Sequence, residues 1–514
     1  CLADINNDNS DEIIFAANSK IYVYSGNGDK LWDASLQGTA TYPPAVADIN
    51  NNGNLEIVQI TGGVPANGHI YVFDNQGNTL SGWPISIDNN WLVCSPALAD
   101  LDNDKNLEIL VSERVPQGRL HIFRNDGTAF SENWPVILDG YPAVTPSVAY
   151  NYLLKDDPFS NSLSDSLIIM CSTTSVYAFD IEGNIIEGFP IDSTYTKFSY
   201  QSPLICSQLN RTDIIGSTHG DNPEFYALTK TGNYSEYNWP IPTTDNSWTY
   251  CPPTALGLNG TFDFYLFGQP GASEEDSYPT IHAFDPNGNI INGFPYLRTD
   301  GLEGFITAMY SEDLNNLYIF TGSNTKDANG NGLIHGYWAN NDLSEFAELP
   351  EFPIQVQGFT FMNGVNLGDV NNNSKLDLVV LSYDLDFADT DSLHINIFEM
   401  DDINFNPDYC FGTYKGNNLR NGFTTPFGYN AKSDLITNKN QIQVYPTITN
   451  DQINIVCESK FEVELISTQG NLLKKFHVCE KKCTINISDL TQGMYFVKVK
   501  QNNKISTFKV IKLK

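Results

Sequence analysis

A nine-residue acidic loop recurs four times in this chain, and this repetition limits the possible folds more than any other feature. The copies are residues 4–12, 48–56, 100–108 and 369–377. Each has Asp at its first position, Asn or Asp at its third and fifth, and Glu or Asp at its ninth. Each also continues into an apolar, strand-like segment. The repetition indicates an array of similar units, and the alternating oxygen atoms suit a hard cation.

The loops predict up to four structural Ca²⁺ sites, in which the seventh residue contributes only its backbone carbonyl. Mg²⁺ fits less well because its strict octahedron suits such loops poorly. The third loop has four carboxylates, the first has three and the others have two each, so we expect the third to bind most tightly. Turns rich in Asn and Asp also form without a cation, and this alternative stays open. The candidate ligands are Asp4, Asn6, Asp8, Ser10 and Glu12; Asp48, Asn50, Asn52, Asn54 and Glu56; Asp100, Asp102, Asp104, Asn106 and Glu108; and Asp369, Asn371, Asn373, Lys375 and Asp377.

Two further elements accompany the loops. The first is an apolar strand followed by a Gly-containing turn, as in residues 70–77 and 281–288, which predicts a hairpin. The second is an aromatic-Pro pair that closes most repeats. Proline is tolerated at the start of an edge strand, so this pair predicts an outer strand. Its copies are residues 82–84, 133–135, 188–190, 238–240, 293–295 and 351–353.

Together these elements describe four antiparallel strands in about 50 residues, which is the blade of a β-propeller. Asp48 and Asp100 lie 52 residues apart, and Asp369 follows Asp100 by 269 residues, about five periods. We therefore predict an all-β chain with an eight-bladed propeller over residues 1–423. Seven blades and an open β-solenoid are the alternatives. The fourth repeat contains a polar insertion, residues 154–164.

The C-terminal 74 residues differ in charge from the rest of the chain. The whole chain has a net charge of −33, whereas residues 441–514 carry +5 and residues 1–440 carry −38. Such a shift marks a domain boundary. Six alternating strands between residues 452 and 512 predict a small β-sandwich over 441–514, with residues 424–440 as a linker.

The charge and the apolar content of the chain also limit the kinds of molecule that it is expected to bind. A strongly negative chain repels nucleic acid and anionic membrane surfaces. No run of 18 apolar residues occurs, so no transmembrane helix is expected. Cys94, Cys206 and Cys251 stand beside Ser or Pro at the starts of repeats, which predicts buried thiols. Near the C-terminus, Cys479 and Cys483 lie in a hairpin-like segment where they could pair, and Cys457 could compete for either.

The first residues align with the inside of a repeat. Cys1–Asp4 corresponds to Ala97–Asp100, so the sequence begins within a strand. We therefore expect a fragment whose signal peptide and any upstream domain are missing.

The acidic loop, the Glu-Ile-Val type of strand that follows it and the Gly-x-Ile-Tyr-Val-Phe-Asp hairpin resemble the FG-GAP/VCBS repeats of integrin-α-like propellers. The resemblance covers residues 1–423. Four repeats match the metal loop well, whereas the fourth to seventh repeats have lost it, at residues 150–153, 207–210, 257–260 and 311–314. In an eight-bladed ring, the four loop-bearing repeats would be neighbours on one half of one face.

The tail resembles the C-terminal sorting domain of the type IX secretion system of Bacteroidetes. The residues that carry the resemblance are Val444–Pro446, Leu465–Gly470, Leu490–Val497 and Lys509–Lys514. Thr447 and Ile448 depart from the Asn-Pro that often follows in the family. The resemblance implies export across the outer membrane, followed by release or by attachment at the cell surface. An ordinary carbohydrate-binding or Ig-like sandwich is the alternative.

No catalytic residue is predicted. The zinc-hydrolase, nucleophile-elbow, Walker and Cys-x-x-Cys patterns are all missing from the sequence. His121, His282 and His335 occupy a repeat position that elsewhere holds Tyr, which predicts a packing role. Clustered Asp residues could supply a carboxylate pair for glycoside hydrolysis, but loops and turns account for nearly all of them. An enzyme therefore stays open as a class.

We expect an exported, monomeric, non-enzymatic binding or adhesion module that meets a glycan or protein ligand on a propeller face and the type IX machinery through residues 441–514. The alternative is the C-terminal accessory region of a secreted hydrolase, a peptidase or a polysaccharide-degrading enzyme, whose catalytic domain precedes Cys1. Candidate residues for stacking on sugars are Trp91, Trp248, Tyr250 and Trp338.

Overall fold

The computed structural model divides the chain into unit one, Cys1–Gly428, and unit two, Tyr429–Lys514. Almost all regular structure in the described residues is β-strand, which confirms the all-β prediction. The described helices are two short 3₁₀ turns, η3 (Pro407–Tyr409) and η4 (Tyr414–Gly416). The structure describes residues 1–62, 67–87, 92–142, 145–149, 166–192, 196–198, 202–208, 211–235, 238–243, 246–258, 260–270, 277–384, 392–427, 443–445, 448–449, 452–456, 461–467, 471–478, 482–501 and 504–512.

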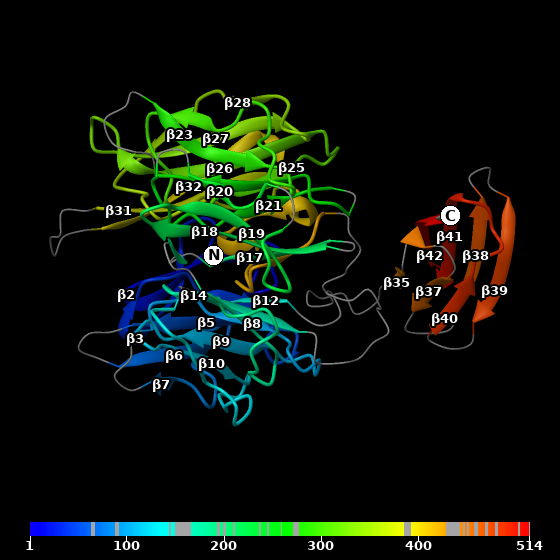
Figure 1. The fold of residues 1–514 in the computed structure, drawn as a ribbon, viewed down its shortest axis with the longest axis horizontal. Coiled ribbons are helices and arrows are strands. Elements are labelled where there is room, and N and C mark those ends of the chain that lie inside the picture. The colour runs from blue at the N-terminus through cyan, green and yellow to red at the C-terminus, as the bar shows by residue number, and fades with distance from the viewer. Residues whose placement is uncertain are drawn as a thin grey trace. The chain divides into compact units, whose positions relative to one another are not determined.

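In its described part, unit one consists of eight small sheets that follow one another in chain order (Figure 1). Sheets 1 and 2 contain β1 (Leu2–Ala3), β2 (Glu12–Tyr24) and β3 (Lys30–Ala40), and then β4 (Ala45–Ala47), β5 (Glu56–Thr61), β6 (Gly68–Phe73) and β7 (Ile85–Ile87). Sheets 3 and 4 contain β8 (Ala97–Ala99), β9 (Glu108–Ser112), β10 (Arg119–Phe123) and β11 (Val136–Ile137), and then β12 (Ser147–Ala149), β13 (Leu167–Cys171), β14 (Ser175–Phe179) and β15 (Ile191–Asp192).

The remaining four sheets repeat this antiparallel order. Sheets 5 and 6 contain β16 (Thr196–Phe198), β17 (Leu204–Gln208), β18 (Arg211–Gly220), β19 (Glu224–Thr229) and β20 (Ile241–Pro242), and then β21 (Thr254–Leu256), β22 (Phe264–Gly268), β23 (Tyr278–Phe284) and β24 (Tyr296–Arg298). Sheets 7 and 8 contain β25 (Thr307–Tyr310), β26 (Asn316–Lys326), β27 (Gly332–Asn340), β28 (Phe346–Glu348) and β29 (Ile354–Val356), and then β30 (Asn366–Gly368), β31 (Lys375–Tyr383) and β32 (Leu393–Asn404).

The repeat elements have the structures that their residues predict. Each aromatic-Pro pair is followed at once by the last strand of its sheet, as Pro84 is by β7 and Pro135 by β11. The preceding Gly82 adopts φ 91°, and a Cβ there would lie 2.1 Å from the carbonyl oxygen of Asp126, so this turn requires glycine. The predicted insertion at residues 154–164 lies outside the described residues.

The tryptophans of these motifs connect neighbouring sheets. Trp83 Nε1 in sheet 2 donates to the carbonyl of Asn125 in the hairpin turn of sheet 3, at 3.0 Å. Trp134 makes the same bond to Ile181 of sheet 4 at 2.9 Å, and Trp239 to Pro286 of sheet 6 at 3.0 Å. Each ring is buried and packs against a phenylalanine of the next sheet. These three tryptophans therefore connect sheet 2 to sheet 3, sheet 3 to sheet 4 and sheet 5 to sheet 6 in the same way.

The last sheet packs against the first. Leu2, Ile13 and Phe15 of sheet 1 form one buried cluster with Val370 and Val379 of sheet 8. The backbone N–H of Asp11 donates to the carbonyl of Asp369 at 3.2 Å. Sheets 1 and 8 therefore meet although they lie at opposite ends of unit one in sequence.

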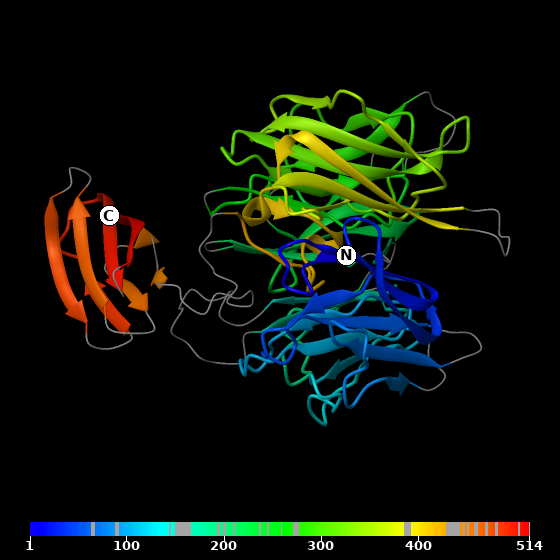
Figure 2. The same cartoon turned by 180° about the vertical axis from the view of Figure 1, so that it is seen from behind.

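A segment that follows sheet 8, residues 410–427, reaches all eight sheets, and we call it the central segment. Its two strands are β33 (Cys410–Phe411), which pairs with β25 of sheet 7, and β34 (Phe423–Thr424), which pairs in parallel with β17 of sheet 5. The other bonds link Val46 N to Asn418 O, Leu98 N to Leu419 O, Val148 N to Asn421 O, Leu367 N to Gly412 O, Phe427 N to Gly257 O and Asn418 Nδ2 to Leu2 O. Figures 1 and 2 show the N-terminus beside this segment.

Unit two contains two sheets in its described residues, with the orders β35-β37-β40 and β36-β42-β41-β38-β39. All six strands expected between residues 452 and 512 are present, and their buried residues alternate, as Val497 and Val499 do. The strands are β35 (Gln443–Tyr445), β36 (Ile448–Thr449), β37 (Gln452–Val456), β38 (Phe461–Ser467), β39 (Leu472–Val478), β40 (Lys482–Asn486), β41 (Gly493–Gln501) and β42 (Lys504–Lys512).

The central segment makes Asn418 a sensitive position. Its Nδ2 donates to the carbonyl of Leu2 at 2.6 Å, and its own carbonyl accepts from Val46 N. Asn418→Ala leaves the Leu2 carbonyl unpaired and should destabilise unit one by about 1–3 kcal/mol. The measurement is the midpoint of urea unfolding followed by tryptophan fluorescence. The exposed Asn292→Ala is the control, and equal midpoints for the two variants would contradict the prediction.

Candidate metal loops

The four acidic loops share one hydrogen-bond scaffold. In each, the first residue's carboxylate accepts from the backbone N–H groups of the fifth and sixth residues, as Asp4 does from Asp8 and Asn9 at 3.0 and 2.9 Å. The fifth residue's side chain accepts from the seventh N–H, and the ninth residue's carboxylate accepts from the second N–H. The corresponding bonds of the other loops start from Asn52, Gly53, Asn54 and Ile49; from Asp104, Lys105, Asn106 and Leu101; and from Asn373, Ser374, Lys375 and Val370.

The loop backbone is as regular as its hydrogen bonds. The fourth residue is Asn in every copy and has a positive φ, 62° at Asn7 and 54° at Asn51. The sixth residue also has a positive φ, from 63° at Ser374 to 90° at Gly53. Asn and Gly tolerate this region best, which explains why these positions are rich in them.

The ninth residue places a carboxylate in a buried position among like charges. Loss of solvation, reinforced by Asp8 and Asp4, raises the pKa of Glu12 to about 7. The same burial, with Asp102 and Asp100 nearby, raises the pKa of Glu108 to about 8. Burial also raises the pKa of Glu56, and that of Asp377 to about 6. A cation at each loop would offset this crowding of negative groups.

Several loop oxygen atoms are buried without a hydrogen-bond partner among the described residues. They are Asn50 Oδ1, Asp102 Oδ1 and Asp377 Oδ1, and each stands at a predicted ligand position. In the third loop, carboxylate oxygens of Asp100, Asp102 and Glu108 lie within 4.8 Å of one another. Buried oxygen atoms without donors fit a cation, so the residues present suit Ca²⁺.

The sequence analysis missed two charged residues that lie next to the loops. Arg124 Nη1 lies 2.9 Å from Asp102 Oδ2 and 3.9 Å from Glu108 Oε1, so a guanidinium already neutralises part of the third loop. In the fourth loop, Asn371 Nδ2 donates to Glu399 at 2.8 Å, which brings an additional carboxylate close. The repeat offered one signal: Arg124 directly follows β10, at a position where other repeats have Asp, as Asp74 does after β6 in sheet 2.

Each loop joins the first and second strands of its sheet, in sheets 1, 2, 3 and 8. Loops one and four bond through Asp11 N and Asp369 O, and loops two and three through Leu107 N and Ile49 O at 2.9 Å. The predicted neighbourhood of loops four and one is therefore present. Among the repeats that lost the metal pattern, the described turn at Ser311–Leu314 is closed by its own bonds, such as Ser311 Oγ to Asp313 at 2.6 Å.

The repeat histidines His335 and His121 have carboxylate partners, which the sequence analysis did not predict. His335 Nε2 contacts Asp300 at 3.0 Å and its Nδ1 contacts Glu348 at 2.8 Å. His121 contacts the buried Glu113. The rings of all three repeat histidines, including His282, also stack on the aromatic residue two positions further along the strand, as a packing role predicts. A repeat position fixes where the ring stands, whereas its partner comes from elsewhere in the sheet.

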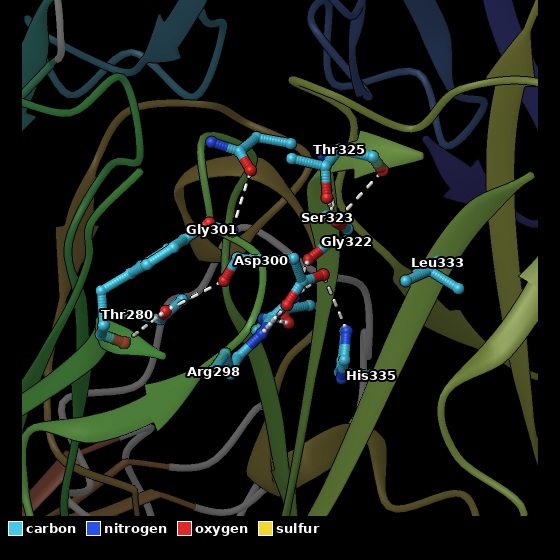
Figure 3. A network of polar contacts seen from close by, with 12 residues as sticks. Thr280, Arg298, Asp300, Gly301, Gly322, Ser323, Thr325, Leu333 and His335 are labelled. Carbon is cyan, nitrogen blue, oxygen red and sulfur yellow. Dashed lines mark hydrogen bonds and ion pairs between the residues drawn. The ribbon is translucent and has the colours of Figure 1, made fainter. Parts of the chain in front are cut away.

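The contacts of His335 belong to a buried polar network that joins sheets 6 and 7 (Figure 3). Arg298 Nε and Nη2 bind the two carboxylate oxygens of Asp300 at 2.7 and 2.8 Å, and Nη1 donates to Thr321 at 2.9 Å. His335 and Arg298 hold the pKa of Asp300 well below its usual range, although burial acts in the opposite direction. Because each charge has a close partner, the network fixes β24 against β26 and β27.

Removing one charge from this network should be costly. In Asp300→Asn the buried Arg298 loses its counter-charge, and unit one should lose about 3–5 kcal/mol of stability. Thermal unfolding measured by circular dichroism tests this. The exposed Asp342→Asn serves as the control, and a melting temperature equal to that of the control would refute the structural role.

Most of the predicted thiols and several of the aromatic residues can be placed. Cys94, Cys206 and Cys251 are buried free thiols, as expected, and Cys483 is partly buried. Cys457, Cys479 and Trp91 lie outside the described residues. Trp338 Nε1 donates to Asn316 at 2.9 Å. Trp248 packs edge-on against Tyr250, with ring centroids 5.0 Å apart.

Tyr250 lines a pocket of about 400 Å³ in unit one. The pocket is surrounded by segments that precede the first strands of the sheets, such as Tyr42–Pro44 before β4 and Glu303–Phe305 before β25. The acidic loops follow the opposite ends of four first strands, β1, β4, β8 and β30. The pocket and the loops therefore lie at opposite ends of the first strands.

Comparison with known families identifies both ends of the chain. Residues 4–59 match the FG-GAP-like repeat, and residues 443–513 match the secretion system C-terminal sorting domain. No helix in the described residues is long and apolar enough to cross a membrane. The chain thus contains an FG-GAP-like repeat near its beginning and a type IX secretion sorting domain at its end, and it is exported to the cell surface or the extracellular space.

No curated protein matches the chain. Among solved structures it is similar to the BP39L lectin of Burkholderia pseudomallei, with TM-score 0.42 and 10% identity over 68% of this chain and 95% of that chain. It is also similar to the quinohemoprotein alcohol dehydrogenase of Comamonas testosteroni, with TM-score 0.40 and 11% identity over 73% and 71%. TM-scores below 0.5 assign no function to this chain.

Proposed function

We propose that this protein is a calcium-stabilised, eight-bladed propeller that acts as a non-enzymatic binding or adhesion module at the cell surface. The main support is the hydrogen-bond scaffold that the four acidic loops share. In three of these loops, an oxygen atom of a predicted ligand is buried without a hydrogen-bond partner among the described residues. These loops stand at the ends of the first strands away from the pocket. Ions at such loops hold the scaffold and leave the pocket face open to a ligand.

The eight sheets of unit one are the proposed blades. Two observations support this: sheet 8 packs against sheet 1, and the central segment bonds with every sheet. In unit two the two sheets enclose one buried cluster that includes Ile453, Val463 and Val510, which supports a β-sandwich.

The proposed ions are structural. Carboxylate, amide and backbone oxygens are ligands of Ca²⁺, and the ion would draw the first, third, fifth and ninth residues of a loop together. Because a folded loop binds the ion and an unfolded chain does not, calcium stabilises the fold by mass action. The ligand that we propose for this module is a glycan or a protein.

Calcium removal should therefore destabilise unit one. Saturation at 100 times the dissociation constant corresponds to about 2.7 kcal/mol per site, so EGTA should lower the melting temperature by several degrees. Calcium titration followed by differential scanning calorimetry measures this. No change in melting temperature over the titration would remove the calcium proposal.

A matched variant separates the third loop from the others. Arg124→Gln removes the guanidinium that contacts Asp102 and should tighten calcium binding at that loop, with a larger calcium-induced rise in melting temperature. Arg119→Gln, on the same strand but paired with Glu113, is the control.

The sorting domain should be required for export. Deleting residues 441–514 leaves unit one entire but removes the segment that the secretion machinery recognises, so the truncated protein should accumulate inside the cell. Fractionation of a type IX-competent host and immunoblotting measure the distribution. Normal export of the truncated protein would contradict the assignment.

A further inference from the structure

The pocket of unit one has an unusual charge at its wall. Arg420 belongs to the central segment and is fully buried. Its Nε donates to the carbonyl of Pro44 at 3.2 Å, and its Nη1 donates to Tyr414 O at 2.7 Å and Thr413 Oγ1 at 2.8 Å. Nη2 has no hydrogen-bond partner among the described residues. One edge of a buried guanidinium is therefore left unused.

Arg420 also has no carboxylate partner in the ion pairs of the described residues. Among the described residues it contacts carbonyl and hydroxyl oxygens and the ring of Tyr414, whose centroid lies 5.9 Å from the guanidinium carbon. A buried cation without a counter-charge costs several kcal/mol. The bonds to Pro44 and Tyr414 explain how the residue fixes the central segment, but they do not use Nη2.

The rest of the pocket wall is aromatic and polar. Tyr42, Tyr250, Phe305 and Tyr414 contribute rings. Among the described lining residues, Arg420 is the one basic side chain and Glu303 the one acidic side chain. Glu303 Oε2 accepts from Tyr250 N at 3.0 Å, and burial raises its pKa to about 7. The pocket volume falls within the range of about 300–1,000 Å³ that is typical of small-molecule sites.

We propose that this pocket binds a small acidic sugar, whose carboxylate is attracted by the uncompensated charge of Arg420 in the pocket wall and whose ring packs on the aromatic wall. The inference rests on the proposed binding function and names its ligand class. A carboxylate would supply the counter-charge that this buried guanidinium lacks among the described residues. A doubly charged phosphate fits less well, because one donor edge must serve it beside the carboxyl group of Glu303. Tyrosine rings with polar tips suit the alternating apolar and hydroxyl faces of a sugar.

Isothermal titration of the calcium-loaded full chain with D-galacturonate, D-glucuronate and the neutral D-galactose tests the proposal. The acidic sugars should bind, their binding should weaken as NaCl rises, and D-galactose should not bind measurably. No heat from either acidic sugar, or equal affinity for D-galactose, would overturn the proposal.

Two variants locate the site without removing Arg420, whose substitution risks misfolding. Met362, which lines the pocket and is partly exposed, becomes an obstruction in Met362→Trp, and binding should weaken about tenfold or more. Glu303→Gln removes the acidic wall and should tighten binding. The control is Leu393→Trp, an equally exposed apolar position on β32 that does not line the pocket. Unchanged affinity in Met362→Trp would place any binding elsewhere and overturn the proposal.

A glycan array with the same variants distinguishes this inference from the wider function. Acidic glycans retained by the wild type and lost by Met362→Trp would support the pocket. Neutral glycans retained equally by both proteins would leave the binding module standing and would refute the carboxylate site.

Discussion

The hydrogen bonds between the central segment and the first strands hold unit one together. A first strand has one edge without a partner in its own sheet, and unpaired backbone groups in the interior are costly. Residues 410–427 supply partners such as Asn418 O for Val46 N, Leu419 O for Leu98 N and Gly422 O for Ile205 N. One short segment thereby ties sheets that are far apart in sequence. Any change in its path would affect every sheet at once.

The same segment brings charge into the interior. Lys415 is buried, and its Nζ donates to Pro146 O at 2.7 Å and to Ser147 Oγ at 2.9 Å. Burial holds the pKa of Lys415 well below its usual range. Arg420 instead keeps one unused edge beside the pocket. These two residues show that a segment needed for the fold can also contribute charged side chains to the interior and to the pocket.

The acidic loops and the pocket divide unit one along its first strands. Loops at one end concentrate carboxylates, as Asp100, Asp102 and Glu108 do within 4.8 Å. The pocket at the other end has one acidic and one basic side chain in its described lining. The carboxylates of the loops, which would repel a small anion, are therefore separated from Arg420 by the length of the first strands. This separation supports a scaffold role for the loops.

The repeat by itself determined the strand order, the hairpins, the outer strands after each proline and the position of the acidic loops, because these depend on neighbouring residues. It marked Arg124 as unusual but could not place it beside Asp102, nor Glu399 beside Asn371, because these pairs are formed by other parts of the same sheet. It also assigned residues 410–423 to the last repeat, although they form most of the central segment. The pocket and the free edge of Arg420 exist only once eight sheets surround that segment. The local sequence pattern determined the turns and the acidic loops. Contacts across the unit were decided by tertiary packing, because no short-range pattern encodes them.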